Sequence, residues 1–121
     1  MGKILIVDDQ CSIRELLSHL FKRVATVITS GSLEGARMAL SDHKFDLVIS
    51  DLRLSRADGQ EGLELLSYVR TTSPDTKVII ISGYGTDAIK DEAQRLGAMD
   101  FIEKPINISH LFSKVQALNT K

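Results

Sequence analysis

The sequence predicts an α/β fold, a doubly wound five-stranded parallel sheet with five helices, from two observations. Short apolar runs rich in β-branched residues, typical of buried strands, alternate with segments whose apolar residues repeat at helical spacing. The alternation is strict along the whole chain, which is the pattern of a parallel sheet with helices on both faces. The 121 residues fit one domain, which we expect over residues 1–121.

Two strands and two helices are predicted in the first part of the chain. Lys3–Val7 is an apolar run and is predicted to be a buried strand. Ser12 can cap the next helix, because Glu15 completes a capping-box pattern. The apolar residues of that helix are Ile13, Leu16, Leu17, Leu20 and Phe21. Ala25–Thr29 is predicted to be the second strand. The second helix is Ser32–Leu40, with three residues facing inward: Leu33, Ala36 and Leu40.

The middle of the chain supplies two strands around a loop and a helix. Asp46–Ser50 is the third predicted strand, and Ser55–Gly62 is polar, contains two glycines and is predicted to be a loop. The helix that follows ends before Ser73-Pro74, because proline disfavours its continuation. It is marked by Leu63, Leu66 and Val69. Lys77–Ile81 is the most apolar strand and is expected to be central.

The last part of the chain completes the alternation. Ala88, Ile89, Ala93 and Leu96 indicate a helix, which Gly97 stops. Asp100–Glu103 is the fifth predicted strand. The closing helix is indicated by Ile108, Leu111, Phe112, Val115 and Leu118. Right-handed crossovers leave few strand orders, and we favour the flavodoxin-like order 2-1-3-4-5.

Composition excludes several classes of function. The net charge is −1, from 15 basic and 16 acidic residues, so the chain lacks the basic field of a nucleic-acid-binding protein. Cys11 is the only cysteine, so no internal disulfide is available and a reducing cytosol is the simplest compartment. The longest apolar runs are four residues, far shorter than a membrane span. We therefore expect a cytoplasmic protein without direct nucleic-acid or membrane binding.

Reactive side chains stand at the ends of four predicted strands. Asp8 and Asp9 follow the first strand and Asp51 the third, while Ser82 and Lys104 follow the fourth and fifth. The carboxyl ends of neighbouring parallel strands share a crevice, where open α/β sheets bind ligands. Three carboxylates, one hydroxyl and one ammonium meeting there suit a divalent cation and a phosphoryl group.

The acidic side chains point to magnesium. Each aspartate alone is also a common turn residue, but crowded carboxylates repel each other unless a cation neutralises them. Mg²⁺ keeps several waters and takes one or two carboxylates plus a phosphate oxygen. We assign Asp9 and Asp51 as direct ligands, and Asp8 as a ligand that binds directly or through water.

The same crevice offers a nucleophile. Asp51 is the best candidate, because a carboxylate can attack a phosphoryl group and form an aspartyl phosphate. Ser82 would lie beside the phosphoryl oxygens, although a serine before Gly83 is by itself more often a turn residue. Lys104 would pair with a phosphate oxygen, although a lone lysine is usually solvated. Phe101, on an edge strand, is by default a core residue.

Together these residues resemble the receiver domain of two-component response regulators. That family has an acidic pair after the first strand, an acceptor aspartate after the third, Ser or Thr after the fourth and Lys-Pro after the fifth. The chain matches over essentially its whole length, with Asp8-Asp9, Asp51, Ser82 and Lys104-Pro105. There are two departures. Ser55 stands where receivers usually have proline, and the loop Ser55–Gly62 is about three residues longer than usual.

The resemblance implies a signalling module rather than a metabolic enzyme. Asp51 would take a phosphoryl group, with Mg²⁺, from the phosphohistidine of a sensor kinase or a histidine phosphotransferase. The backbone carbonyl of Arg53 would complete the metal site. Ser82 and Lys104 would then move toward the phosphoryl group, and Phe101, in the place of the family's switch aromatic, would turn inward. The response would pass to a protein partner, a fused output domain or a phosphorylation-dependent dimer.

Three other functions are compatible with parts of this pattern. A phosphatase of the haloacid-dehalogenase type requires a second aspartate, two residues after its nucleophile, as its acid/base. This chain has Arg53 at that position. A flavin carrier requires a phosphate-binding loop rich in hydroxyl groups and glycine after the first strand. This chain has Asp8-Asp9 there. A receiver-like module that never binds phosphate is the third, and the intact acid cluster argues against it.

Overall fold

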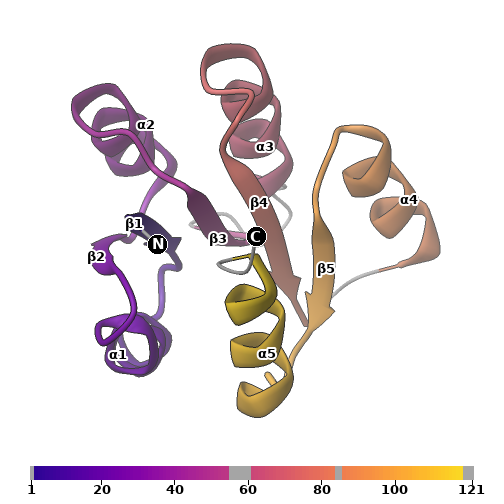
Figure 1. The fold of residues 1–121 in the computed structure, drawn as a ribbon. Coiled ribbons are helices and arrows are strands. Elements are labelled where there is room, and N and C mark those ends of the chain that lie inside the picture. Colours follow the sequence, from indigo (N-terminus) through magenta and orange to yellow (C-terminus); the bar gives the residue numbers. More distant parts are fainter. Residues whose placement is uncertain (1, 55–60, 84–85, 119–121) are drawn as a thin grey trace.

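The fold is a parallel sheet of five strands covered by helices on both faces. The computed structural model describes residues 2–54, 61–83 and 86–118. The strand order is β2-β1-β3-β4-β5, and each neighbouring pair is parallel (Figure 1). The fold class and the strand order predicted from the sequence are therefore confirmed.

Strands and helices alternate in the chain as predicted. The strands are β1 Lys3–Val7, β2 Thr26–Ser30, β3 Leu47–Asp51, β4 Lys77–Ser82 and β5 Asp100–Glu103. The helices are α1 Cys11–Phe21, α2 Leu33–Asp42, α3 Glu61–Thr72, α4 Asp87–Arg95 and α5 Ile108–Leu118. Among the described residues, no helix has the length and apolar character that a membrane crossing requires.

The sheet separates two hydrophobic cores, because side chains alternate between the two faces of each strand. Ile4 and Ile6 of β1 pack with α1 and α5, whereas Leu5 and Val7 pack with the layer that contains α2, α3 and α4. Figure 1 shows the two helical layers on opposite sides of the sheet. Every residue of β3 is buried, as expected for a strand covered on both faces. The middle strand is thus β3, and β4, expected to be central, lies beside it.

Of two helix starts predicted from capping residues, one is correct and one differs for a local reason. Helix α2 begins as expected, because the Ser32 hydroxyl accepts the backbone N–H of Gly35 at 3.1 Å. Helix α1 does not begin at Ser12. Its N-cap is Gln10, which provides no side-chain cap, and the N–H of Gln10 is bound by the Asp8 carboxylate instead. A turn at the strand end therefore decides where this helix starts.

The predicted loop Ser55–Gly62 is partly helix. Residues 55–60 lie outside the described residues, but Glu61 and Gly62 form the first turn of α3. A Cβ atom at Gly62 would lie 2.5 Å from the carbonyl oxygen of Asp51 and 2.8 Å from the Cα of Leu52. Gly62 is therefore a point of close contact between α3 and the end of β3, not a loop residue.

The predicted stop of α4 is correct and has a conformational cause. Gly97 has φ +100, a backbone conformation that residues with a side chain rarely adopt. A Cβ at Gly97 would also lie 2.6 Å from Cδ of Arg70, so the arginine side chain would have to shift. The chain then turns into β5, which brings Lys104 back to the edge of the sheet where β1 and β3 end.

Replacing Phe21 by alanine is expected to lower the free energy of unfolding by about 3–5 kcal/mol. Phe21 is fully buried, and its ring stacks on Phe112 with ring centroids 5.9 Å apart, so the change leaves a cavity between α1 and α5. Urea denaturation measures the loss. Leu16→Ala on the same helix is the control, because Leu16 is 44% exposed and should cost less than about 1 kcal/mol. Equal losses in the two variants would contradict the packing described for α1.

Candidate functional site

Three aspartates gather where β1 and β3 end. Asp51 is the last residue of β3, and Asp8 directly follows β1, the neighbouring strand. Asp8 and Asp51 are buried, while Asp9 is exposed. One carboxylate oxygen of each lies within 4.8 Å of those of the other two. The crevice that the sequence predicted from strand ends thus brings its three acidic residues together.

Lys104 reaches this cluster from the far edge of the sheet. Its Nζ lies 3.2 Å from Oδ2 of Asp51 and 3.5 Å from Oδ2 of Asp8. Its backbone N–H donates to the carbonyl of Ser82 at 2.9 Å, which fixes the residue at the end of β5. The ammonium is a donor without acceptor capacity, so it can offset repulsion between two carboxylates or hold a phosphoryl oxygen.

The charges of the cluster are not balanced. Burial raises the pKa of Asp8, although the Gln10 N–H and Lys104 oppose that effect. Burial also raises the pKa of Asp51, the Asp8 charge adds to the rise, and Lys104 again opposes it. Burial would lower the pKa of Lys104, but Asp51 and Asp8 outweigh it and hold that pKa above its ordinary value. One ammonium thus serves two carboxylates, and neither carboxylate is fully compensated.

Backbone contacts fix the end of β1, and one of them comes from a residue that the sequence did not single out. Oδ1 of Asp8 accepts the backbone N–H of Gln10 at 2.9 Å, which turns the chain from β1 into α1. The guanidinium of Arg14 donates to the carbonyl of Asp8 at 2.7 Å. An arginine on a helix is ordinary, so no sequence signal distinguished Arg14.

Ser82 and Arg53 lie at the ends of β4 and β3, the strand that Asp51 closes. Ser82 is buried at the end of β4, next to Ile81, the residue that pairs with Asp51 in the sheet. Arg53 follows β3 and is half-buried, and its backbone N–H donates to the Asp51 carboxylate. The ends of β3 and β4 therefore each contribute a polar group close to Asp51.

Phe101 is placed on β5, away from the acidic cluster. Its ring is half-buried against the core shared by α2, α3 and α4, and Nζ of Lys90 lies 6.0 Å from the ring centre. A hollow of about 220 Å³ opens beside it. The lining residues are Lys90, Gln94, Ala98, Met99, Asp100 and Phe101. The packing expected of an aromatic residue is present, and there is room next to the ring.

The donor set at the strand ends fits a hard divalent cation. Mg²⁺ prefers oxygen ligands and uses one or two carboxylates while keeping several waters. Asp8, Asp9 and Asp51 supply three carboxylates within 4.8 Å of one another, one of them open to solvent. Two of these carboxylates are incompletely balanced by Lys104, so a cation would relieve their repulsion.

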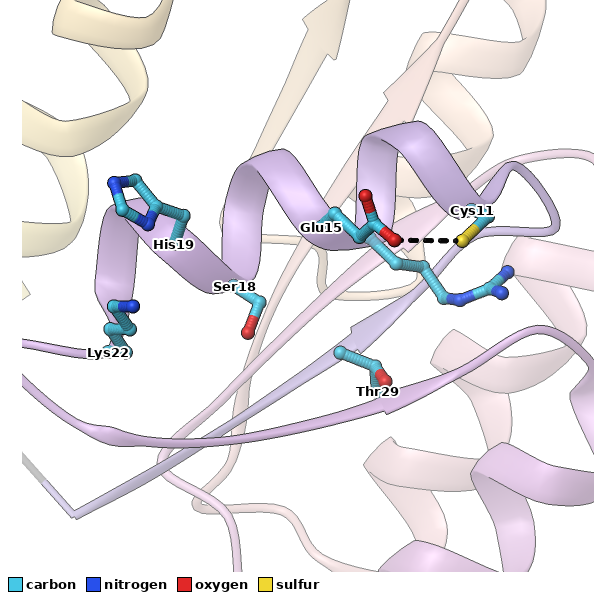
Figure 2. Close-up of a pocket in the computed structure, with 7 residues that line it drawn as sticks. Cys11, Glu15, Ser18, His19, Lys22 and Thr29 are labelled. Atoms are coloured by element: carbon cyan, nitrogen blue, oxygen red, sulfur yellow. Dashed lines mark hydrogen bonds between the residues drawn. The ribbon is translucent and has the colours of Figure 1, made fainter.

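A second hollow, of about 450 Å³, runs between α1 and β2. Figure 2 shows its polar side chains, with Glu15, Ser18 and His19 on α1, Lys22 just after α1 and Thr29 on β2. The Cys11 thiol donates to Glu15 Oε1 at 3.3 Å across one turn of the helix. This groove is lined by one carboxylate and by several basic and neutral polar side chains, so it lacks the cluster of carboxylates found at the strand ends.

The family model for the response regulator receiver domain matches residues 4–116. The chain belongs to the receiver domain family. Receiver domains are phosphorylated on an aspartate, act in two-component signalling and are generally not metabolic enzymes. Family membership therefore favours the receiver over the phosphatase and flavin-carrier alternatives.

The receiver's relatives include short and long proteins. Response regulator protein PilR of Pseudomonas aeruginosa is 38% identical over 110 residues, which are 90% of this chain and 24% of PilR. Sporulation initiation phosphotransferase F of Bacillus subtilis is 31% identical over 116 residues, which are 94% of this chain and 90% of that protein. The chain thus spans about a quarter of one relative and nearly all of the other.

The fold of this receiver is also that of solved structures. The CheY-like receiver domain protein of Methanospirillum hungatei superimposes with a TM-score of 0.88 and 25% identity. The superposition covers 98% of this chain and 94% of that one. A similarity of this extent agrees with the five-stranded, doubly wound architecture described above.

Asp8→Asn is expected to raise the melting temperature at pH 7 in the presence of a chelator. Both buried carboxyls have pKa values above the usual range, so their ionised forms cost stability at pH values above those pKa values. The amide relieves that cost and can still accept the Gln10 N–H. A rise of a few degrees, as about 1 kcal/mol gives in a domain of this size, is expected.

The same variant should lose its advantage in acid. As the pH falls through the raised pKa values, the wild type takes up protons and no longer carries the repelling charges. Thermal denaturation at pH 7 and near pH 4 measures the difference. Asp75→Asn, an exposed change in the loop before β4, is the control and should alter the melting temperature little at either pH. A destabilised Asp8→Asn at pH 7 would show that Lys104 already compensates Asp8.

Proposed function

We propose that this receiver is a switch in which Asp51 takes the phosphoryl group of a phosphohistidine on a sensor kinase or a histidine phosphotransferase. A carboxylate oxygen of Asp51 forms a bond to phosphorus while the bond from phosphorus to the histidine nitrogen breaks, and the freed imidazole takes up a proton. Later attack by water on the aspartyl phosphate returns the carboxylate and releases inorganic phosphate. The burial of Asp51 beside Lys104 and two further carboxylates supports this assignment.

Magnesium is the proposed cofactor. Asp8, Asp9, Asp51 and the backbone carbonyl of Arg53 would hold it, directly or through water. When bound, the ion would neutralise charge on the phosphoryl oxygens during transfer. The oxygen-only donor set and the incomplete compensation by Lys104 support this choice over a softer metal.

Lys104 and Ser82 are proposed to act on the phosphoryl group. The ammonium of Lys104 would move from the carboxylates to a phosphoryl oxygen, where it stabilises the charge that develops during transfer. The hydroxyl of Ser82 would donate to another oxygen once the group is attached. Lys104 already contacts Oδ2 of Asp51, and Ser82 ends the strand that pairs with β3, so both need only short movements.

Phosphorylation is proposed to change the surface around β5. Movement of Ser82 would let Phe101 turn inward, and the hollow beside the ring would change shape. The helix–strand face formed by α4, β5 and α5 would then favour a different partner, which is a population shift driven by a new local charge. The partner would be a separate protein, a fused output domain or a second copy of the receiver, in the cytoplasm.

Asp51→Asn is expected to abolish phosphorylation. The protein is incubated with acetyl phosphate and Mg²⁺, and intact mass spectrometry measures the added phosphoryl group. The wild type should gain one group and the amide variant none, because the amide is a poor nucleophile. Asp75→Asn is the control, because Asp75 precedes β4 and lies at the amino ends of the strands. This variant should gain the phosphoryl group as the wild type does.

Lys104→Gln should still accept the group, but about 10²-fold more slowly, because it loses a charge aimed at the transferring oxygens. Equal labelling of wild type and Asp51→Asn would remove Asp51 from the proposal. Failure of the wild type to be labelled by acetyl phosphate or by any phosphohistidine donor would favour a receiver-like module that does not bind phosphate.

Fluorine NMR tests the proposed switch. Fluorophenylalanine labels all four phenylalanines of the chain, and the signal of Phe101 is expected to shift when Asp51 is phosphorylated. Phe45, buried at the opposite edge of the sheet, is the internal control and should keep its signal. Ser82→Ala should be phosphorylated without the full Phe101 shift. A shift of the same size at Phe101 and Phe45 would indicate a global change instead of a local switch.

A further inference from the structure

Glu61 is a buried carboxylate beside the proposed phosphorylation site. It is the first residue of α3 and is only 2% exposed. Its Oε1 accepts the backbone N–H of Leu54 at 3.4 Å. Leu54 is itself buried, so the bond lies away from solvent. A glutamate in the first turn of a helix is ordinary, because the helix dipole favours a negative charge there. The helix dipole does not explain why this glutamate is buried against the backbone that follows β3, because an exposed side chain would gain the same interaction.

The bond to Leu54 constrains the peptide group that contains the carbonyl of Arg53. The N–H of Leu54 and the C=O of Arg53 belong to one planar group, and in a trans peptide they point in opposite directions. The cis peptide found in the structure is elsewhere, at Lys104-Pro105. When Glu61 holds the N–H on its own side, the Arg53 carbonyl is therefore directed away from Glu61.

Leu52, the residue before Arg53, is also anchored by its backbone groups. The N–H of Leu52 donates to the carbonyl of Ile81 at 2.9 Å, which continues the β3–β4 ladder. The carbonyl of Leu52 accepts the N–H of Gly62 at 2.8 Å. Two consecutive residues of α3, Gly62 and Glu61, thus hold Leu52 and Leu54, which restricts rotation of the two peptide groups at Arg53.

We propose that Glu61 is a positioning residue that orients the backbone carbonyl of Arg53 for the divalent cation. The inference rests on the proposed function, in which that carbonyl is a magnesium ligand. Glu61 acts through the Leu54 N–H and does not touch the ion. The hydrogen bond joins α3 directly to the chain that follows β3. The direction of the carbonyl is therefore set by α3.

Three variants separate the hydrogen bond from the charge. Glu61→Leu removes both the acceptor and the charge at similar volume. Glu61→Gln keeps an oxygen that can accept the Leu54 N–H but removes the charge. Glu61→Asp keeps the charge but is one methylene shorter, and it replaces the leucine variant if that protein is unstable. Glu64→Leu is the matched control, because Glu64 is an exposed acidic residue in the same first turn of α3.

Two quantities are measured for each variant. Calorimetric titration gives the Mg²⁺ affinity, and NMR gives the rate of amide hydrogen exchange at Leu54. Melting temperatures verify that each variant is folded. Glu61→Leu and Glu61→Asp should weaken Mg²⁺ binding about tenfold or more, as loss of a supporting contact around a metal does. Both should also speed exchange at Leu54 about tenfold. Glu61→Gln should change either quantity less than about threefold, and Glu64→Leu should change neither.

The outcomes distinguish the positioning role from the metal site itself. If Glu61→Gln weakens binding as much as Glu61→Leu, the charge matters and the hydrogen bond does not, which overturns the inference. Wild-type affinity in Glu61→Leu also overturns it, while the proposed function stands. If the wild-type protein binds no Mg²⁺ in the titration, the metal site of the proposed function fails and the positioning role fails with it.

Discussion

The mutual repulsion of carboxylates at one edge of the sheet is the constraint on which the site depends. In the strand order β2-β1-β3-β4-β5, the parallel strands β1 and β3 are neighbours and their carboxyl ends lie side by side. Asp8 and Asp51 must therefore share a small volume. Burial makes this arrangement more costly, and Lys104, brought back by β5, offsets only part of it. The fold thus keeps the site short of positive charge. Such a local departure from the most stable arrangement is common at functional sites.

The acidic side chains can face the crevice because their backbones are held from both helical layers. On one face of the sheet, Arg14 of α1 binds the carbonyl of Asp8. On the other face, Gly62 and Glu61 of α3 bind the chain just after Asp51. The supporting groups attach to the main chain and leave the carboxylates available. The doubly wound architecture is therefore what permits support of both strand ends at once.

The sequence predicted most of the fold and of the site, because both follow from where buried strands end. Near-continuous apolar runs identified β1, β3 and β4, and the polar residues at their ends identified Asp8, Asp51 and Ser82. One error came where a hydrogen bond in the turn after β1 overrode a capping pattern. Ser12 completes a capping-box pattern, but the Asp8 carboxylate binds the N–H of Gln10 and starts α1 earlier.

Contacts with the main chain were beyond sequence reasoning for the same physical reason. Gly62 looks like a loop glycine, yet it is required by the approach of α3 to the Asp51 carbonyl. Arg14 and Glu61 are of types common on any helix, and only the three-dimensional structure shows which backbone groups they bind. Local composition carries no information about such partners, because they are distant in the chain or separated by a loop.

The edge strand β5 is held partly by ion pairs between its own residues and the neighbouring helices. It pairs with β4 alone, and its two end residues make ion pairs with opposite layers, Asp100 with Lys114 of α5 and Glu103 with Lys90 of α4. These pairs are partly exposed, and added salt screens such interactions within about 8 Å at physiological ionic strength. Rising ionic strength should therefore loosen the strand that carries Phe101 and leads to Lys104 before it affects the strands inside the sheet.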